Sequence, residues 1–166
     1  MDFSDFDLRD PADEGVWLHL EEPFSGEPLY RQEDNEIVTQ VTDHPCRVKV
    51  RGNHSEDMRR LIRDWERRES QFAMRVMRAT DKQAEAVMRQ KQDAQENHHK
   101  AILLCAVMDW QNITARKDPK DRKSKPELVD RTDENVLRLM RNNGFQTQIL
   151  RKAGDEEDFF KRALTG

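Results

Sequence analysis

The chain has 166 residues, of which 35% are hydrophobic and 37% are charged, and its mean hydropathy is −1.04. Globular domains usually contain about 45–50% apolar residues, glycine included, so this core must be small and some helices must remain in solvent or bury their apolar face against a partner. The longest apolar run, AILLCAVM, is too short to span a bilayer. The formal net charge of −4 disfavours nucleic-acid binding through the field of the whole protein.

The N-terminal sequence and the cysteines indicate a cytoplasmic protein. The first residues lack the basic and apolar regions of a signal peptide. Cys46 and Cys105 are far apart and have no metal or redox spacing, so we expect reduced thiols. Residues 1–14 carry six acids and one base, which predicts a mobile acidic arm.

Residues 15–52 predict a small antiparallel sheet. Apolar and polar residues alternate in three short runs, at 16–20, 37–41 and 46–52. In the third run Val48 and Val50 share one face and the basic residues share the other, so one face of the sheet should be wet.

Residues 53–113 predict long helices. Apolar residues recur at steps of three and four from Met58 onward, and neither proline nor glycine occurs between 53 and 117. Thr80-Asp81 is the expected break, because both residues favour helix caps. The apolar stretch 99–110 (HKAILLCAVMDW) is the expected buried helix.

The last third of the chain predicts an exposed charged loop over 114–131 and C-terminal helices over 132–166. Thr132 can cap a short helix that residues 142–144 (NNG) would end, and Gly154 or Asp155 would mark a later joint. The predicted fold is therefore α+β and mostly α, with a small N-terminal antiparallel sheet followed by four or five helices, the first ones long.

The sequence HSED at 54–57 contains residue types found in hydrolytic sites. Neighbouring residues in one segment rarely form a Ser–His–acid triad, and no G-x-S-x-G motif surrounds the serine. Helix capping explains the cluster better, with Asn53 or Ser55 as the cap and two acids in the first turn. We expect no catalytic residues, and His54 receives no role.

Other candidate sites also have structural explanations. His98 and His99 are adjacent, so they point about 100° apart on a helix and cannot share one metal ion. We therefore expect no metal and no cofactor. Arginines between 59 and 78 alternate with acids at helical pair spacing, which favours a solvated face over a nucleic-acid site.

Several ordered motifs resemble tail assembly chaperones of long-tailed, siphovirus-type bacteriophages. They are the turn Ser25-Gly26-Glu27-Pro28-Leu29 after Pro23, the strand-to-helix junction Val48, Val50, Gly52 and Ser55, the sequence Ala106-Val107 with Trp110 and Ile113, the segment Glu134-Asn135-Val136, and the terminal Ile149, Ala153, Phe159 and Phe160. The chain departs from the family pattern in the polar segment 31–45 and in the charged loop 114–131.

The resemblance implies a non-enzymatic protein of the host cell cytoplasm that is absent from the mature virion. Such chaperones bind the helical tape measure protein, keep it soluble and recruit major tail tube subunits. The alternatives are a minor structural tail or connector protein and, less favoured, a nucleic-acid-binding regulator that uses the arginine-rich helix. Neither a membrane nor nucleic acid is expected as a partner.

A stripe on the first long helix is the expected partner-binding surface. Its members are Met58, Leu61, Trp65, Phe72 and Val76. The stripe could equally fill the protein's own core, and it could also mediate self-association. Methionines suit either use, because their flexible thioethers adapt to irregular surfaces.

Overall fold

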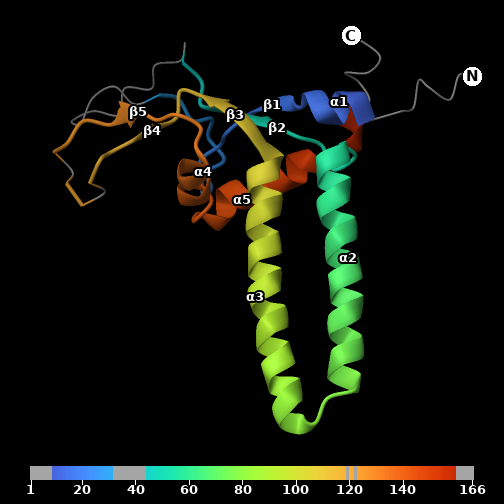
Figure 1. Cartoon of the computed structure of the whole chain (residues 1–166). Coiled ribbons are helices and arrows are strands. Elements are labelled where there is room, and N and C mark those ends of the chain that lie inside the picture. Colours follow the sequence, from blue (N-terminus) through green and yellow to red (C-terminus); the bar gives the residue numbers. More distant parts are fainter. Residues whose placement is uncertain (1–8, 32–43, 119, 122, 160–166) are drawn as a thin grey trace, which may run out of the picture.

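The computed structural model describes residues 9–31, 44–118, 120–121 and 123–159. It consists of a small mixed head and a long helical hairpin that extends from the head (Figure 1). The chain is mostly helical with a small antiparallel sheet, which confirms the predicted α+β class. The elements in chain order are α1 (Arg9–Glu14), β1 (Val16–His19), β2 (Arg47–Val50), α2 (Glu56–Met77), α3 (Asp81–Ala106), β3 (Val107–Gln111), β4 (Thr114–Ala115), β5 (Glu127–Leu128), α4 (Asp133–Leu139) and α5 (Asn143–Ala153).

The sheet has the order β1-β2-β3, and both strand pairs are antiparallel. Val48 and Val50 are fully buried while Arg47 is exposed, as the alternation predicts. The hairpin α2–α3 lies between β2 and β3 in the sequence, so it takes the place of the turn that joins two neighbouring strands. The backbone N–H of Arg51 donates to the carbonyl of Ala106 at 2.9 Å and closes the base of this insertion.

The prediction of a buried helix over 99–110 is wrong at its C-terminal end. α3 ends at Ala106, and Val107–Gln111 form β3. Trp110 lies opposite Val48 in the ladder, and its indole N–H donates to the carbonyl of Val129 at 2.8 Å. Pairing with β2 therefore decides the conformation of a segment whose apolar character fits either a helix or a strand. Consequently the sheet is not built from the N-terminal region alone, and the strand expected at 37–41 lies outside the described residues.

The expected N-terminal arm contains a helix over Arg9–Glu14, while residues 1–8 lie outside the described part. Ala12 is fully buried in a small cluster with Val16 and Phe159. Gly52 lies directly against it, since a Cβ on Gly52 would stand 2.8 Å from the Cβ of Ala12. Burial of this small cluster explains why a segment rich in acids takes up a fixed helix.

The C-terminal third agrees with the predicted caps but not with every boundary. The hydroxyl of Thr132 accepts from the backbone N–H of Asn135 at the start of α4. Asn142, expected at the end of this helix, is instead the N-cap of α5, and its side chain accepts from Gly144. The segment 114–131 was expected to be a loop, but its ends pair as β4 and β5.

The main core joins the sheet to α4, α5 and the base of the hairpin. Its fully buried members include Val48, Val107, Val136 and Ile149. The core therefore gathers residues from both ends of the chain around the base of the hairpin. Within the described residues, no helix is long and apolar enough to cross a membrane.

Candidate partner-binding hairpin

The start of α2 explains the HSED cluster. Ser55 is fully buried, and its hydroxyl accepts from the backbone N–H of Met58 at 3.3 Å, so Ser55 is the N-cap. Asn53, the other candidate cap, instead donates its backbone N–H to Ala153 of α5 at 2.8 Å. The carboxylate of Asp13 accepts from the N–H of Glu56 at 3.1 Å, which satisfies a second free donor of the first turn.

The side chain of His54 takes no part in the hydrogen bond of the Ser55 hydroxyl. Its Nε2 is 2.9 Å from a carboxylate oxygen of Glu156, beyond the end of α5. Asp57 pairs with Arg51. His54 and Asp57 therefore join the start of α2 to the head, while the carboxylate of Glu56 pairs with Arg60 within α2. The hydroxyl of Ser55 bonds to Met58 and not to His54.

The two helices of the hairpin meet along a seam with alternating steps of three and four residues. On α2 the seam positions are Met58, Ile62, Trp65, Glu69, Phe72 and Val76, and Ala79 continues the spacing just after the helix. On α3 they are Ala84, Val87, Lys91, Ala94, His98, Ala101 and Cys105. This spacing is the heptad pattern of a coiled coil, here between antiparallel helices. Large residues of α2 meet mainly small residues of α3, which allows close packing.

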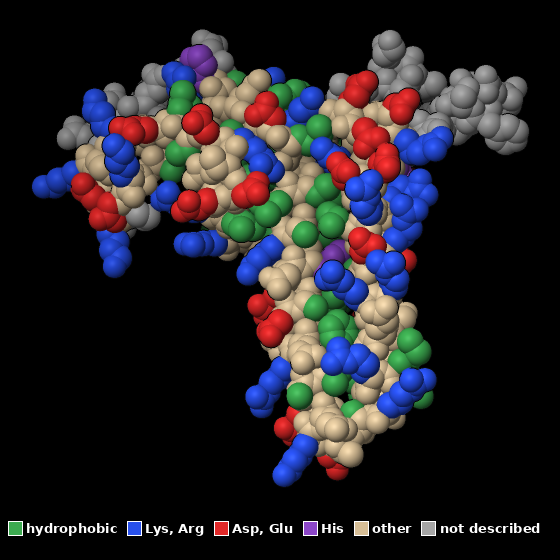
Figure 2. All heavy atoms as spheres, viewed as in Figure 1, with side chains coloured by type: hydrophobic (Ala, Val, Ile, Leu, Met, Phe, Trp, Pro, Cys, Tyr) green, Lys and Arg blue, Asp and Glu red, His purple; other side chains and the backbone are tan. Residues whose placement is uncertain are grey.

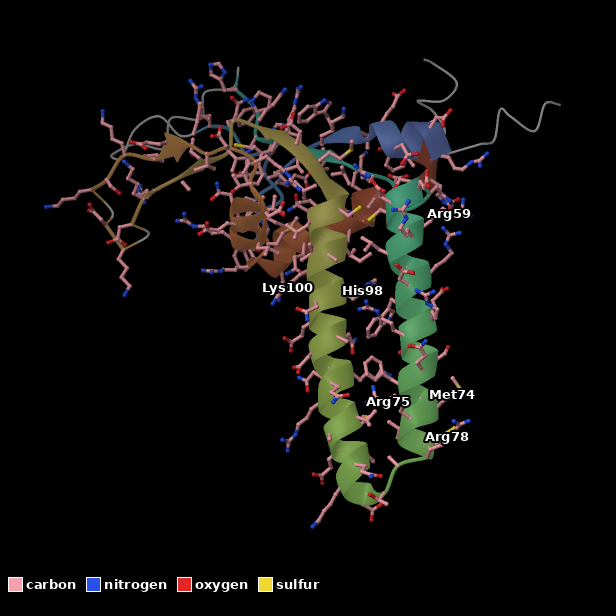
Figure 3. All side chains as sticks on the ribbon, viewed as in Figure 1. Arg59, Met74, Arg75, Arg78, His98 and Lys100 are labelled. Carbon is pink, nitrogen blue, oxygen red and sulfur yellow. The ribbon has the colours of Figure 1, made fainter. Side chains whose placement is uncertain are left out.

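Polar contacts interrupt the seam at three levels. The ring of His98 stacks on Trp65 with centroids 5.1 Å apart. Lys91 pairs with Glu69 at 3.2 Å, and Arg75 donates to the side chain of Gln90 at 2.7 Å. Figure 3 shows His98 and Arg75 between the two helices. These contacts favour one register of the helices, because a shifted register would separate the polar partners.

The seam position of His98 affects its protonation. Partial burial lowers the pKa of His98 below its ordinary value of 6.5, and the nearby His99 and Arg68 lower it further. The imidazole is therefore held in its neutral form beside Trp65.

The structure turns most of the predicted partner-binding stripe toward α3, and Leu61 lies beside the seam next to Leu104 and Cys105. Met58 is buried in the main core at 1% exposure, so it contacts other residues of this chain. Leu61, Trp65, Phe72 and Val76 are only half-buried. One neighbouring helix covers a single side of each, so a third helix could still bury their outer edges.

Three methionines are exposed at the free end of the hairpin, away from the core. Met74 is 51% exposed, Met77 is 86% exposed and Met88 is 55% exposed. Figure 3 shows Met74 on the side of α2 that faces away from α3. Met58 at the base of the hairpin and Met140 in the head are buried by contrast.

Basic side chains surround this apolar surface. Between positions 59 and 78 there are seven arginines and three acidic residues. Figure 2 shows basic side chains along the outer edge of α2 and hydrophobic side chains exposed toward the free end. Some arginines form ion pairs within the helix, such as Arg67 with Asp64 at 3.2 Å. The surface suits an apolar partner flanked by acidic residues.

Arg131 fixes the other end of the hairpin, a role that the sequence pattern did not reveal. Its Nε and Nη2 donate to the carbonyl of Val107 at 3.0 and 2.8 Å, and Nη2 also donates to Leu104 at 2.9 Å. Its Nη1 pairs with Asp133 at 2.7 Å. A cation here satisfies carbonyls that the last turn of α3 leaves free. The position lies in a segment expected to be an exposed loop, and no local motif marks it.

Neither cysteine lies in a reactive setting. Cys46 is buried, its thiol donates to the carbonyl of Asn112 at 3.2 Å, and burial raises the pKa of the thiol to about 11. Burial also raises the pKa of Cys105. Across the described ranges, no group of three or more histidine, cysteine or acidic side chains could hold a metal ion.

Comparison of this chain with protein-family models, with curated proteins and with solved structures finds no match.

Proposed function

We propose that this protein is a tail assembly chaperone of a long-tailed bacteriophage, and that its hairpin holds helices of the tape measure protein. The ordered sequence motifs support the family. The exposed methionines at the free end of the hairpin are the observation that carries the mode of binding.

The bound segment is an amphipathic helix with acidic residues beside its apolar stripe. A helix laid along the hairpin would cover Met77 and Met88 and the outer edges of Phe72 and Val76. Methionine side chains adapt to many apolar surfaces, so one hairpin can accept successive turns of a long and variable helix. The excess of arginine along α2 attracts acidic flanks and speeds the encounter.

In this role the hairpin shields apolar stripes of the tape measure protein before the tail tube assembles around it. The protein performs no catalysis, recruits major tail tube subunits, acts in the host cell cytoplasm and does not remain in the virion. The surface of the head remains accessible to tail tube subunits, because the hairpin extends away from the head (Figure 1).

The test is co-expression with the tape measure protein from the same phage genome. We expect the tape measure protein to be soluble and to co-purify with the wild-type chain. The variant Met77→Glu/Met88→Glu should lose this complex. The matched control Gln71→Glu/Asn97→Glu adds the same charge at exposed positions of the same helices, away from the Met77–Met88 face, and should retain it.

A tape measure protein that stays equally soluble without this chain would refute the proposal. Equal binding by the methionine variant and its control would refute the assigned surface. Mass spectrometry of purified particles separates a chaperone, which should be missing, from a structural tail subunit, which should be present.

A further inference from the structure

The turn from Glu21 to Pro28 in the head is rigidly built. Glu21 and Pro28 form a β-bridge, and the N–H of Glu22 donates to the carbonyl of Glu27 at 2.8 Å. The carboxylate of Glu22 accepts from the N–H groups of both Phe24 and Ser25. Gly26 has a φ of +72°, a conformation that glycine adopts without strain.

Helix α5 holds this turn in place. The side-chain amide of Gln148 makes two hydrogen bonds to the backbone of Glu21, at 2.9 and 2.8 Å. Pro23 lies against Gly144, where an added Cβ would stand only 2.4 Å from Pro23. The turn is thus fastened to the head at both its base and its tip.

This rigid turn presents Phe24 to solvent. Phe24 is 94% exposed, the highest exposure among the large hydrophobic side chains that the structure describes. An aromatic residue on a fixed backbone loses little conformational freedom on binding, which is the property of an interface anchor. The side chains of Glu21, Glu22 and Glu27 place negative charge around it.

A groove on the same head has the complementary character. Its volume is about 470 Å³, within the range of ligand pockets. Its apolar lining comes from Trp110, Ile113, Val129, Leu139 and Phe145. The charged residues that line it are Arg138 and Arg141, and no acidic residue lines it among the residues described.

We propose that two copies of this chain associate through their heads, with Phe24 of each copy seated in the groove of the other. The glutamates of the turn then lie against the arginines of the groove. The turn and the groove are neighbours, because Pro23 touches Gly144 while Asn142 and Phe145 line the groove. A two-fold axis between them therefore forms both contacts at once, as a symmetric dimer requires.

Phe24 does not enter the groove of its own chain, because Pro23 is fixed on Gly144 and leaves the Phe24 side chain exposed. The dimer leaves both hairpins uncovered, so it does not depend on the proposed function. It would give the assembly two hairpins instead of one.

The test is sedimentation velocity of the full chain over a concentration series. We expect a monomer–dimer equilibrium, and Phe24→Ala should weaken it by roughly a thousandfold, because each dimer loses two interface anchors of about thirtyfold each. Met77→Ala removes another highly exposed apolar side chain at the far end of the hairpin and should leave the dimer unchanged. Circular dichroism checks that each variant is folded.

Charge reversal tests the pairing itself. Glu21→Arg/Glu27→Arg and Arg138→Glu/Arg141→Glu should each weaken the dimer, and the two changes combined in one chain should restore it. For an interface of micromolar affinity, a wild-type chain that is still monomeric at about 100 μM would overturn the proposal. So would a dimer that Phe24→Ala leaves intact, that Met77→Ala dissociates, or that the combined reversal fails to restore.

Discussion

Replacing Arg131 tests whether one side chain holds the base of the hairpin. Its guanidinium makes three hydrogen bonds to the carbonyls of Leu104 and Val107, where α3 ends and β3 begins. A charged hydrogen bond contributes about 1.5–3 kcal/mol, and a cation at a helix C-terminus about 0.3–1 kcal/mol. The ion pair with Asp133 contributes little, because that carboxylate is 68% exposed.

These contributions overlap, so Arg131→Ala should lower the free energy of unfolding by about 2–4 kcal/mol. Arg131→Lys should recover part of the loss, because an ammonium can reach a carbonyl but lacks the planar fork that spans two of them. Urea unfolding followed by circular dichroism gives the free energies, and hydrogen exchange shows whether the last turn of α3 opens first. Arg63→Ala, on the exposed face of α2, is the matched control and should change stability by less than about 0.5 kcal/mol. Equal stability of the Arg131→Ala and Arg63→Ala variants would refute the reasoning.

Three further predictions concern the hairpin junction, its seam and the buried thiol. Ser55→Ala should cost about 1 kcal/mol in urea unfolding, while Ser70→Ala, on the exposed face of α2, should not destabilise. The pKa of His98 is lower in the folded chain than in the unfolded chain, so the unfolded chain is protonated at His98 first and the free energy of unfolding should fall as the pH drops through about 6.5. His98→Gln should reduce this dependence on pH, and an unchanged dependence would contradict the prediction. Cys46, with its pKa raised to about 11, should not react with a thiol reagent at about pH 8 until the chain unfolds, and rapid labelling at Cys46 in the folded chain, as opposed to Cys105, would contradict this.

Local signals predicted the features that neighbouring residues determine. The alternation around Val48 places a strand, Thr80 marks the break between α2 and α3, and Ser55 and Thr132 cap helices as expected. Each of these depends on a side chain and the backbone within a few positions of it. The wet and buried faces of β2 follow from the same short-range rule.

Distant contacts decide the features that the sequence pattern missed. Nothing inside the run AILLCAVMDW marks the change from helix to strand at Ala106, because the residues on both sides of this position are apolar and fit either structure. The strand forms because β2, more than fifty residues earlier, offers an unpaired edge. The sequence also could not show what the apolar stripe of α2 faces, because the pattern identifies the residues that share a face but not that α3 covers them.

The insertion of the hairpin between β2 and β3 has a consequence for binding. Both of its ends are fixed in the sheet, through the pairing of Val50 with Val107 and the bond from Arg51 to Ala106. Its free end, by contrast, is held only by the α2–α3 seam and by polar contacts beside it, such as Arg75–Gln90. Stability should therefore decrease from the base toward the methionines at the free end. A partner helix would add burial where the hairpin has least, so part of its binding free energy should appear as slower hydrogen exchange in the distal halves of α2 and α3.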